Sequence, residues 1–309
     1  MKAVFMGTPD FSVETLKEML LAGYEVAAVV TQPDKPKGRG KELSMSPVKE
    51  FAIEKGLTVL QPLKARDEAF IAQIRQIAPD VIVVVAFGQI LPDELLSMPK
   101  YGCVNVHASL LPKYRGASPI QWAVIDGENE SGVTTMMMDT GVDTGDMLLQ
   151  KSVPLSKKET GGSLFDKLSV TGAKLLVETL KGLEKGTIQK TPQEHAKATH
   201  TKKIEKSLGE LDFHKPADEL ECLIRGLNPW PSAYTKLHGK TLKIWDADVV
   251  VGDFAEYEPG QVVFADKTGF TIKCGKNALA VKELQLEGKK RMDARAFLLG
   301  TRVETGERL

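Results

Sequence analysis

The sequence has no surplus of either charge, because its 41 lysine and arginine residues match its 41 aspartate and glutamate residues. Any contact with nucleic acid must therefore come from a local group of cations rather than from the whole chain. Long apolar runs are also missing: the longest, residues 81–87, is far shorter than the ~20 residues that cross a bilayer. The chain enters a strand-like segment at once, without the regions of a secretory leader, so we expect a soluble cytoplasmic protein.

Cysteines and nucleotide-binding motifs are scarce as well. Three cysteines, Cys103, Cys222 and Cys274, form an odd set at wide spacing, which fits neither a disulfide framework nor a CxxC site, so we expect reduced, buried thiols. No GxGxxG motif follows the first predicted strand, and NAD is not an expected cofactor. The acidic residues lack the spacing of an EF-hand, and one histidine among scattered aspartates is a weak zinc set, so we expect no metal.

The first part of the chain alternates between strand-like and helix-like runs, which predicts an α/β fold with a doubly wound, mostly parallel, Rossmann-like sheet. Thr8, followed by Pro9 and Asp10, has the composition of a helix start, with Thr8 as the capping hydroxyl. Strands are expected near residues 2–7, 24–32, 58–61, 81–88, 102–109, 133–139 and 147–155, and helices near 10–23, 46–56, 67–77, 92–97, 118–125 and 162–185.

Residues 186–207 are polar and rich in lysine, which is typical of a connector lying on the surface. Short β-type runs follow it, separated by glycine, aspartate and lysine turns, and predict a small antiparallel, OB-like β-barrel. We expect a catalytic domain over residues 1–188, a basic linker over 189–207 and a C-terminal barrel over 208–309.

Polar side chains gather where a predicted apolar strand ends. Side chains alternate along a strand, so Asn105 and His107 point the same way while Val104 and Val106 face the opposite packing layer. An acidic glycine turn, DTGVDTGD, follows another strand of the same sheet and carries Asp143. A lone histidine is usually a core residue, but a carboxylate on a neighbouring loop favours a site at the carboxyl ends of the strands.

These residue types suit the transfer of an acyl group to an amine without a covalent intermediate. When an amine attacks a formyl carbon, the carbonyl oxygen becomes an oxyanion and the nitrogen must lose a proton. Asn105 and protonated His107 can donate hydrogen bonds to the oxyanion. Asp143 can keep the imidazole charged and accept the proton, directly or through water.

The segments NVHASLLPKYRGASPIQWA and MDTGVDTGD closely resemble the signature of the folate-dependent formyltransferases. The resemblance implies that Asn105, His107 and Asp143 are catalytic and that the donor is 10-formyltetrahydrofolate. It also implies a folate site, whose expected residues are Phe87, Gly88, Ile90, Leu91, Ser109, Leu110, Leu111, Pro112 and Asp139.

The resemblance covers the whole chain for those members of the family that formylate methionyl initiator tRNA, including MGTPDFS, TQPDKPKGRGK and NPWPSAY. It implies that the loop with Lys35, Lys37, Arg39 and Lys41 reaches the acceptor stem of this tRNA. Taken alone, the loop fits an ordinary solvated turn. Further cations expected at the tRNA are Lys203, Lys206, Lys289, Lys290 and Arg291.

Two other functions remain open at this level. One is a formyltransferase that acts on a small amine, and the other is a noncatalytic RNA-binding protein whose α/β domain senses folate. No coiled-coil pattern or long apolar edge requires assembly, so we expect a monomer.

Overall fold

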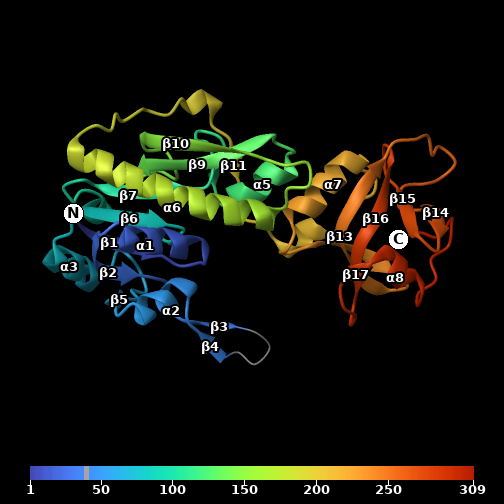
Figure 1. Cartoon of the computed structure of the whole chain (residues 1–309), viewed down its shortest axis with the longest axis horizontal. Helices are drawn as coiled ribbons and strands as arrows, with labels where there is room; N and C mark the ends of the chain where they lie inside the picture. Colours follow the sequence, from blue (N-terminus) through green and yellow to red (C-terminus); the bar gives the residue numbers. More distant parts are fainter. Residues whose placement is uncertain (38–41) are drawn as a thin grey trace. The chain divides into compact units, whose positions relative to one another are not determined.

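The computed structural model describes residues 1–37 and 42–309, which fold as two compact units. The first unit consists of residues 1–116, 131–153 and 165–200, and the second of residues 117–130, 154–164 and 201–309. Each unit has its own central sheet (Figure 1). The second unit thus takes two short segments from the first half of the sequence, which no local signal indicated. The predicted boundaries at residues 188 and 207 stay predictions.

The first unit is built on a seven-stranded sheet in the order β10-β9-β7-β6-β1-β2-β5. The pairs β1–β2, β1–β6, β2–β5 and β6–β7 are parallel, and β7–β9 is antiparallel, so the predicted mostly parallel sheet is confirmed. Its strands are β1 (Lys2–Gly7), β2 (Glu25–Val30), β5 (Val59–Leu60), β6 (Val81–Val85), β7 (Cys103–His107), β9 (Glu130–Met137) and β10 (Met147–Pro154).

All five residues of β6 are buried, so helices or loops must cover both faces of the sheet. The chain runs outward from β1 through β2 to β5 and then crosses to β6, on the other side of β1. This reversal is a topological switch point, where α/β sheets bind ligands beyond the carboxyl ends of their strands. The helices of this unit are α1 (Phe11–Leu21), α2 (Pro47–Glu54), α3 (Glu68–Ile77), α4 (Asp93–Leu96) and most of α6 (Gly161–Lys185).

The helix start after β1 differs from the prediction. Asp10, not Thr8, caps α1, because its carboxylate accepts a hydrogen bond from the backbone N–H of Phe11 at 3.0 Å. The Thr8 hydroxyl instead donates to the carbonyl oxygen of Phe87 at 3.1 Å. Thr8 therefore joins the ends of β1 and β6 at the switch point, a contact between distant residues that the capping pattern could not reveal.

The second unit contains a six-stranded antiparallel sheet in the order β12-β13-β16-β15-β14, with β17 paired to β16. This confirms the predicted small antiparallel domain. The strands are β12 (Ala233–Leu237), β13 (Lys240–Val250), β14 (Val262–Asp266), β15 (Gly269–Lys273), β16 (Ala278–Leu286) and β17 (Met292–Asp293), and the helices are α5 (Pro119–Ile125), α7 (Ala217–Gly226) and α8 (Ala294–Leu298).

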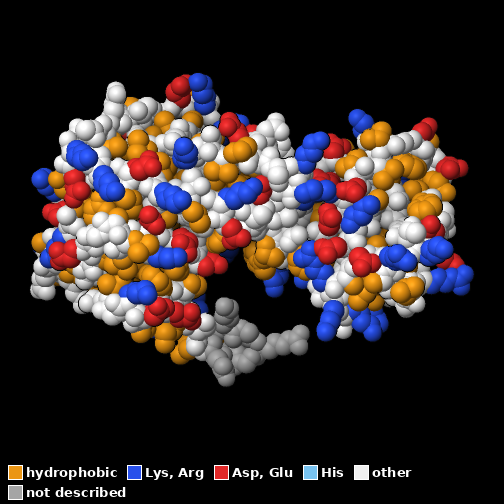
Figure 2. All heavy atoms as spheres, viewed as in Figure 1, with side chains coloured by type: hydrophobic (Ala, Val, Ile, Leu, Met, Phe, Trp, Pro, Cys, Tyr) orange, Lys and Arg blue, Asp and Glu red, His pale blue; other side chains and the backbone are white. Residues whose placement is uncertain are grey.

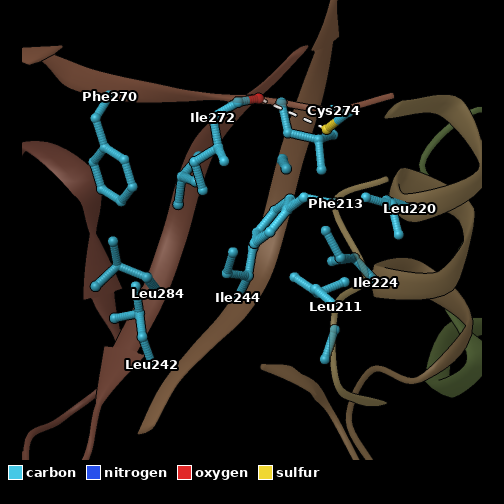
Figure 3. Packing of buried hydrophobic residues seen from close by; sticks show 14 of the residues in the cluster. Leu211, Phe213, Leu220, Ile224, Leu242, Ile244, Phe270, Ile272, Cys274 and Leu284 are labelled. Carbon is cyan, nitrogen blue, oxygen red and sulfur yellow. Dashed lines mark hydrogen bonds between the residues drawn. The ribbon is translucent and has the colours of Figure 1, made fainter. Parts of the chain in front are cut away.

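One apolar core holds this unit together (Figure 3). Leu220 and Ile224 of α7 and Phe213 of the preceding loop face the sheet residues Ile244 and Ile272. Burial of this apolar surface is the main favourable term in the folding of such a domain.

The segments that come from the first half of the sequence are tied into the same unit. Helix α5 packs against α7 at a point where Gly226 leaves no room, since a Cβ there would lie 2.4 Å from Cγ1 of Ile125. Lys158 forms ion pairs with Asp248 at 2.7 Å and with Asp246 at 3.2 Å. Residues 117–130 and 154–164 are therefore both attached to the C-terminal part of this unit.

The remaining short elements include a hairpin of β3 (Lys35–Lys37) and β4 (Glu42–Ser44), where the sequence indicated only a loop. The connector contains η1 (His195–Lys197), β11 (His200–Thr201) and η2 (Lys206–Gly209), and β11 pairs with β8 (Arg115–Gly116). Within residues 1–37 and 42–309, none of the helices combines the length and the apolar character needed to span a membrane.

Two phenylalanines on neighbouring strands give a matched test of the C-terminal core. Phe270 is 1% exposed and Phe264 is 50% exposed. We expect Phe270→Ala to lower the free energy of unfolding by about 3–5 kcal/mol because it leaves a cavity, and Phe264→Ala by about 1 kcal/mol or less. Urea unfolding followed by tryptophan fluorescence measures this, since all 3 tryptophans lie in the second unit. Equal losses for both variants would contradict the packing described.

Candidate active site

Strand β7 presents the two predicted polar side chains on one face of the sheet. Val106, on the opposite face, packs against α6, where a Cβ on Gly172 would lie 3.0 Å from its Cγ1. Asn105 and His107 therefore share the other face, as the alternation predicted. His107 is only 7% exposed, and Asn105 is half-buried.

One ring nitrogen of His107 is committed to the backbone. Nε2 lies 2.9 Å from the carbonyl oxygen of Tyr114. A carbonyl oxygen only accepts hydrogen bonds, so Nε2 carries the proton and donates it. The ring orientation is thereby fixed, and Nδ1 is the nitrogen that faces Asp143. Tyr114 has a φ of 61°, a left-handed backbone conformation that turns the loop sharply at this point.

Asp143 lies between the two polar side chains of β7. Its Oδ2 is 3.6 Å from Nδ1 of His107, and its Oδ1 accepts a hydrogen bond from Nδ2 of Asn105 at 3.4 Å. The backbone N–H of Gly116 donates to Oδ2 at 2.8 Å. The carboxylate of Asp143 thus lies within 3.4–3.6 Å of both the Asn105 amide and the His107 imidazole, although Asp143 comes from a distant segment of the chain.

The acidic turn is shaped by its own side chains and by glycine. Oδ1 of Asp139 accepts hydrogen bonds from the N–H of Gly141 at 3.0 Å and from the hydroxyl of Thr144 at 2.7 Å. Asp143 has a φ of 55°, a left-handed conformation that aspartate tolerates better than most residues. At Gly145 a Cβ would lie 1.9 Å from the carbonyl oxygen of Met137, so only glycine fits there.

The residues expected at the folate lie on two loops of this same unit. Phe87 and Leu91 are buried, whereas Gly88 and Ile90 are exposed on the turn after β6. In the described part of the chain, the backbone groups of Gly88 and Ile90 form no hydrogen bond. These groups are therefore available to the edge of a planar heterocycle. Asp139 is exposed, but its carboxylate is used within the acidic turn.

The SLLP segment is held by the sheet. The backbone of Ser109 and that of Leu111 contact the Thr134 hydroxyl, which donates to one carbonyl at 2.7 Å and accepts from one N–H at 3.1 Å. Leu111 and Ser109 are buried, while Leu110 and Pro112 are half-buried. Leu110 and Pro112 are thus the members of this segment whose side chains remain accessible.

The cations expected at the tRNA are at the surface wherever they are described. Lys35 is exposed on β3, Lys203 and Lys206 are exposed in the connector, and Lys289 and Lys290 are exposed in the turn between β16 and β17. Lys37 lies at the end of β3. Arg39 and Lys41 lie outside the described residues. Lys and Arg side chains are prominent around β17 and α8 (Figure 2).

Arg291 differs from the two lysines before it because its guanidinium already has partners. It forms an ion pair with Glu283 and lies over the ring of Trp245, with Cζ 4.8 Å from the ring centroid. Lys243 lies 5.5 Å from the same centroid. Such cation–π contacts orient the side chain at the surface.

Sequence reasoning missed two buried polar residues that lie next to the acidic turn. Arg115 is 3% exposed and Gln193 is 5% exposed. Arg115 stood in the recognised YRG segment without an assigned role, and Gln193 lies in the polar connector, where no feature of the sequence distinguishes it from its neighbours. Residues 191–192 and 194–197 are exposed, as expected of a connector lying on the surface, and Gln193 is the exception.

The described part of the chain holds no group of three or more histidine, cysteine, aspartate or glutamate residues arranged for a metal ion. All three cysteines are free, and Cys103 and Cys274 are buried as expected, whereas Cys222 is only half-buried. Burial raises the pKa of the Cys103 and Cys274 thiols to about 12, so both stay protonated near neutral pH.

The sequence matches two family models, Formyl transferase over residues 1–180 and Formyl transferase, C-terminal domain, over residues 203–302. It is 62% identical to a methionyl-tRNA formyltransferase of Lachnospira eligens, over 99% of this chain and 98% of that protein. A methionyl-tRNA formyltransferase of Agathobacter rectalis is 60% identical, again over 99% and 98% of the two chains.

The chain belongs to the methionyl-tRNA formyltransferase family. Solved structures share the fold of this formyltransferase at lower identity. An N-formyltransferase from Helicobacter canadensis, in complex with folinic acid and dTDP-3-aminofucose, has a TM-score of 0.66 at 19% identity and covers 91% of this chain and 99% of its own. HypX from Aquifex aeolicus, in complex with tetrahydrofolic acid, has a TM-score of 0.63 at 17% identity, covering 96% of this chain and 47% of its own.

Glycine at the end of the acidic turn gives a test of the site geometry. We expect Gly145→Ala to lower the kcat of this formyltransferase by about 10²-fold, because a Cβ would collide with the Met137 carbonyl and displace Asp143. Gly269→Ala is the matched control, since a Cβ there meets no atom within 4 Å. Steady-state formylation assays on both variants measure the effect. Unchanged kcat in Gly145→Ala would show that the position of the turn does not matter.

Proposed function

We propose that this enzyme transfers the formyl group of 10-formyltetrahydrofolate to the amino group of methionyl initiator tRNA, in the cytoplasm and as a monomer. The observation that carries the proposal is the convergence of Asn105, His107 and Asp143 at the carboxyl end of β7. Whole-length identity of about 60% to methionyl-tRNA formyltransferases supports the acceptor.

In our proposal Asn105 and His107 stabilise the oxyanion that forms when the amine attacks. The Nδ2 amide of Asn105 has two N–H groups, only one of which faces Asp143. The second N–H is free to donate to the developing negative charge. The Nδ1–H of a charged His107 supplies a second donor, since Nε2 is held by Tyr114. Removing one such donor typically costs about 10² to 10³ in rate.

Asp143 has the proton-transfer role. Its Oδ2 lies 3.6 Å from Nδ1 of His107 and pairs with the ring when the ring is protonated. The attacking nitrogen gains positive charge as it bonds to the formyl carbon, and Asp143 accepts its proton directly or through water. The nitrogen that leaves the formyl carbon must gain a proton, so the pair formed by Asp143 and His107 returns one. General acid–base steps of this kind contribute about 10² to 10⁴ in rate.

The residues of the first unit fit a folate donor. The turn after β6 offers the free backbone groups of Gly88 and Ile90 next to the switch point, and Leu110 and Pro112 provide apolar contact. Phe87, Leu91, Ser109 and Leu111 are buried and would support these groups rather than touch the donor with their side chains. Asp139 would act by shaping the acidic turn.

The cations expected at the tRNA have two different roles in our proposal. Lys35, Lys203, Lys206, Lys289 and Lys290 have exposed ammonium groups that suit phosphate oxygens. The roles proposed for Lys37, Arg39 and Lys41 rest on the sequence alone. Arg291 contacts Glu283 and Trp245, so we assign it to the orientation of the turn with Lys289 and Lys290, called the basic turn.

The central experiment is formylation of initiator methionyl-tRNA by the purified protein with 10-formyltetrahydrofolate. We expect His107→Ala to lower kcat by at least about 10²-fold, because one oxyanion donor is lost, while tRNA affinity stays within about twofold. Elongator methionyl-tRNA is the acceptor control. Formation of a product from a small amine but not from methionyl-tRNA would refute the proposed acceptor.

The basic turn can be tested through the salt dependence of tRNA binding. We expect Lys289→Ala and Lys290→Ala each to reduce the slope of log K against log salt by about 1, as the loss of one phosphate contact does. Lys17→Ala is the control, since Lys17 is paired with Glu14 on α1. A slope that stays the same in both turn variants would remove the turn from the tRNA site.

A further inference from the structure

The connector after α6 is part of the active-site scaffold. Thr191 and Met147 exchange two backbone hydrogen bonds of 2.9 Å, which joins the connector to β10. Thr199 accepts from the N–H of Tyr114 through its hydroxyl at 2.8 Å and from the N–H of Arg115 through its carbonyl at 2.9 Å. Between these two attachments the chain passes directly behind the acidic turn.

The side-chain amide of Gln193 binds the backbone of the acidic turn. Its Nε2 donates to the carbonyl oxygen of Asp143 at 2.9 Å and to that of Gly145 at 2.7 Å. These carbonyls flank Thr144, so one amide group fixes the backbone on both sides of a single residue. Both N–H groups of the amide are thereby used in a site that is almost fully buried, where such bonds are costly to lose.

Arg115 fixes which way this amide points. Its Nε and Nη2 donate to Oε1 of Gln193 at 3.0 and 2.7 Å. Because the guanidinium only donates, Oε1 must face Arg115 and Nε2 must face the two carbonyls. Arg115 directly precedes Gly116, whose N–H holds the carboxylate of Asp143. The loop with Arg115 and Gly116 therefore acts on Asp143 in two ways. The Gly116 N–H holds the Asp143 carboxylate, and Arg115 orients the Gln193 amide that holds the Asp143 backbone.

We propose that Gln193 is a positioning residue for formyl transfer, which acts by holding the Asp143 backbone and thereby setting the distance from Asp143 to His107. The inference rests on the proposed function. It deepens that function by assigning part of the active-site geometry to the connector between the two units. Among the described residues, no hydrogen bond joins Gln193 to His107 or Asn105, so its influence on them passes through Asp143.

The decisive variant is Gln193→Glu, which keeps the shape of the side chain and an acceptor for Arg115 but replaces the amide donor with a carboxylate oxygen. Two backbone carbonyls would then face an acceptor. We expect kcat for formylation of methionyl-tRNA to fall by about 10- to 100-fold, the effect of a displacement of about 1 Å at a catalytic group. The KM for tRNA and the affinity for folate should stay within about twofold.

A double-mutant cycle separates this role from a general structural one. In an Asp143→Asn background we expect Gln193→Glu to lower kcat by no more than about twofold, because the group it positions has already lost its function. The same fold loss in both backgrounds would overturn the proposal, and so would an unchanged kcat in the single variant. Gln261→Glu, in the second unit, is the control for the substitution itself and should leave kcat unchanged.

A readout without turnover keeps the test independent of the acceptor. We expect amide hydrogen exchange over residues 139–146 to become at least about tenfold faster in Gln193→Glu and in the apolar variant Gln193→Met. Exchange in β1 should stay the same, which also shows that the variants fold. Unchanged exchange over 139–146 would refute the positioning role. Failure of the unaltered protein to formylate methionyl-tRNA would instead refute the proposed function, without altering this measurement.

Discussion

The site depends on the hydrogen bond from the Gly116 N–H to the carboxylate of Asp143. A carboxylate on an acidic, exposed turn would normally be solvated and free to rotate. Here one oxygen is fixed by the backbone of a loop that also accepts the proton of His107 Nε2. A single loop, residues 110–116, thus fixes the partners of both the imidazole and the carboxylate. Displacement of that loop would disturb both groups together, which makes their geometry a joint property.

The sheet explains why this arrangement lies where it does. Strand β7 is parallel to β6 and antiparallel to β9, so its carboxyl end meets the loop after β6 and faces Thr134 of β9. His107 and Thr134 are paired in register, and the Thr134 hydroxyl holds the backbone of Ser109 and Leu111. Strand pairing therefore places the start of the SLLP loop with respect to Asn105 and His107. On the other face of the sheet, Val106 of β7 packs closely against Gly172 of α6.

Much of this could be predicted from local patterns. Strand alternation was sufficient to place Asn105 and His107 on one face, and alternating apolar runs predicted the parallel sheet. Sequence patterns failed where a polar residue has a distant partner. Thr8 resembles a helix cap but bonds to Phe87, and Gln193 resembles a surface residue but lies behind Asp143. Neither partner is within reach of a periodicity argument, because both contacts arise only after the chain has closed on itself.

The packing of α5 has a consequence for the evolution of the chain. Trp122 and Ile125 of α5 pack against the core of the C-terminal unit, although they precede that unit's main segment by about 80 residues. Removal of the chain beyond the polar connector would take away α7, against which α5 packs, and would expose Trp122 and Ile125, which favours aggregation. A gene fragment ending there is not a self-sufficient module. Recombination that exchanges the C-terminal part must therefore also adapt the helix encoded far upstream.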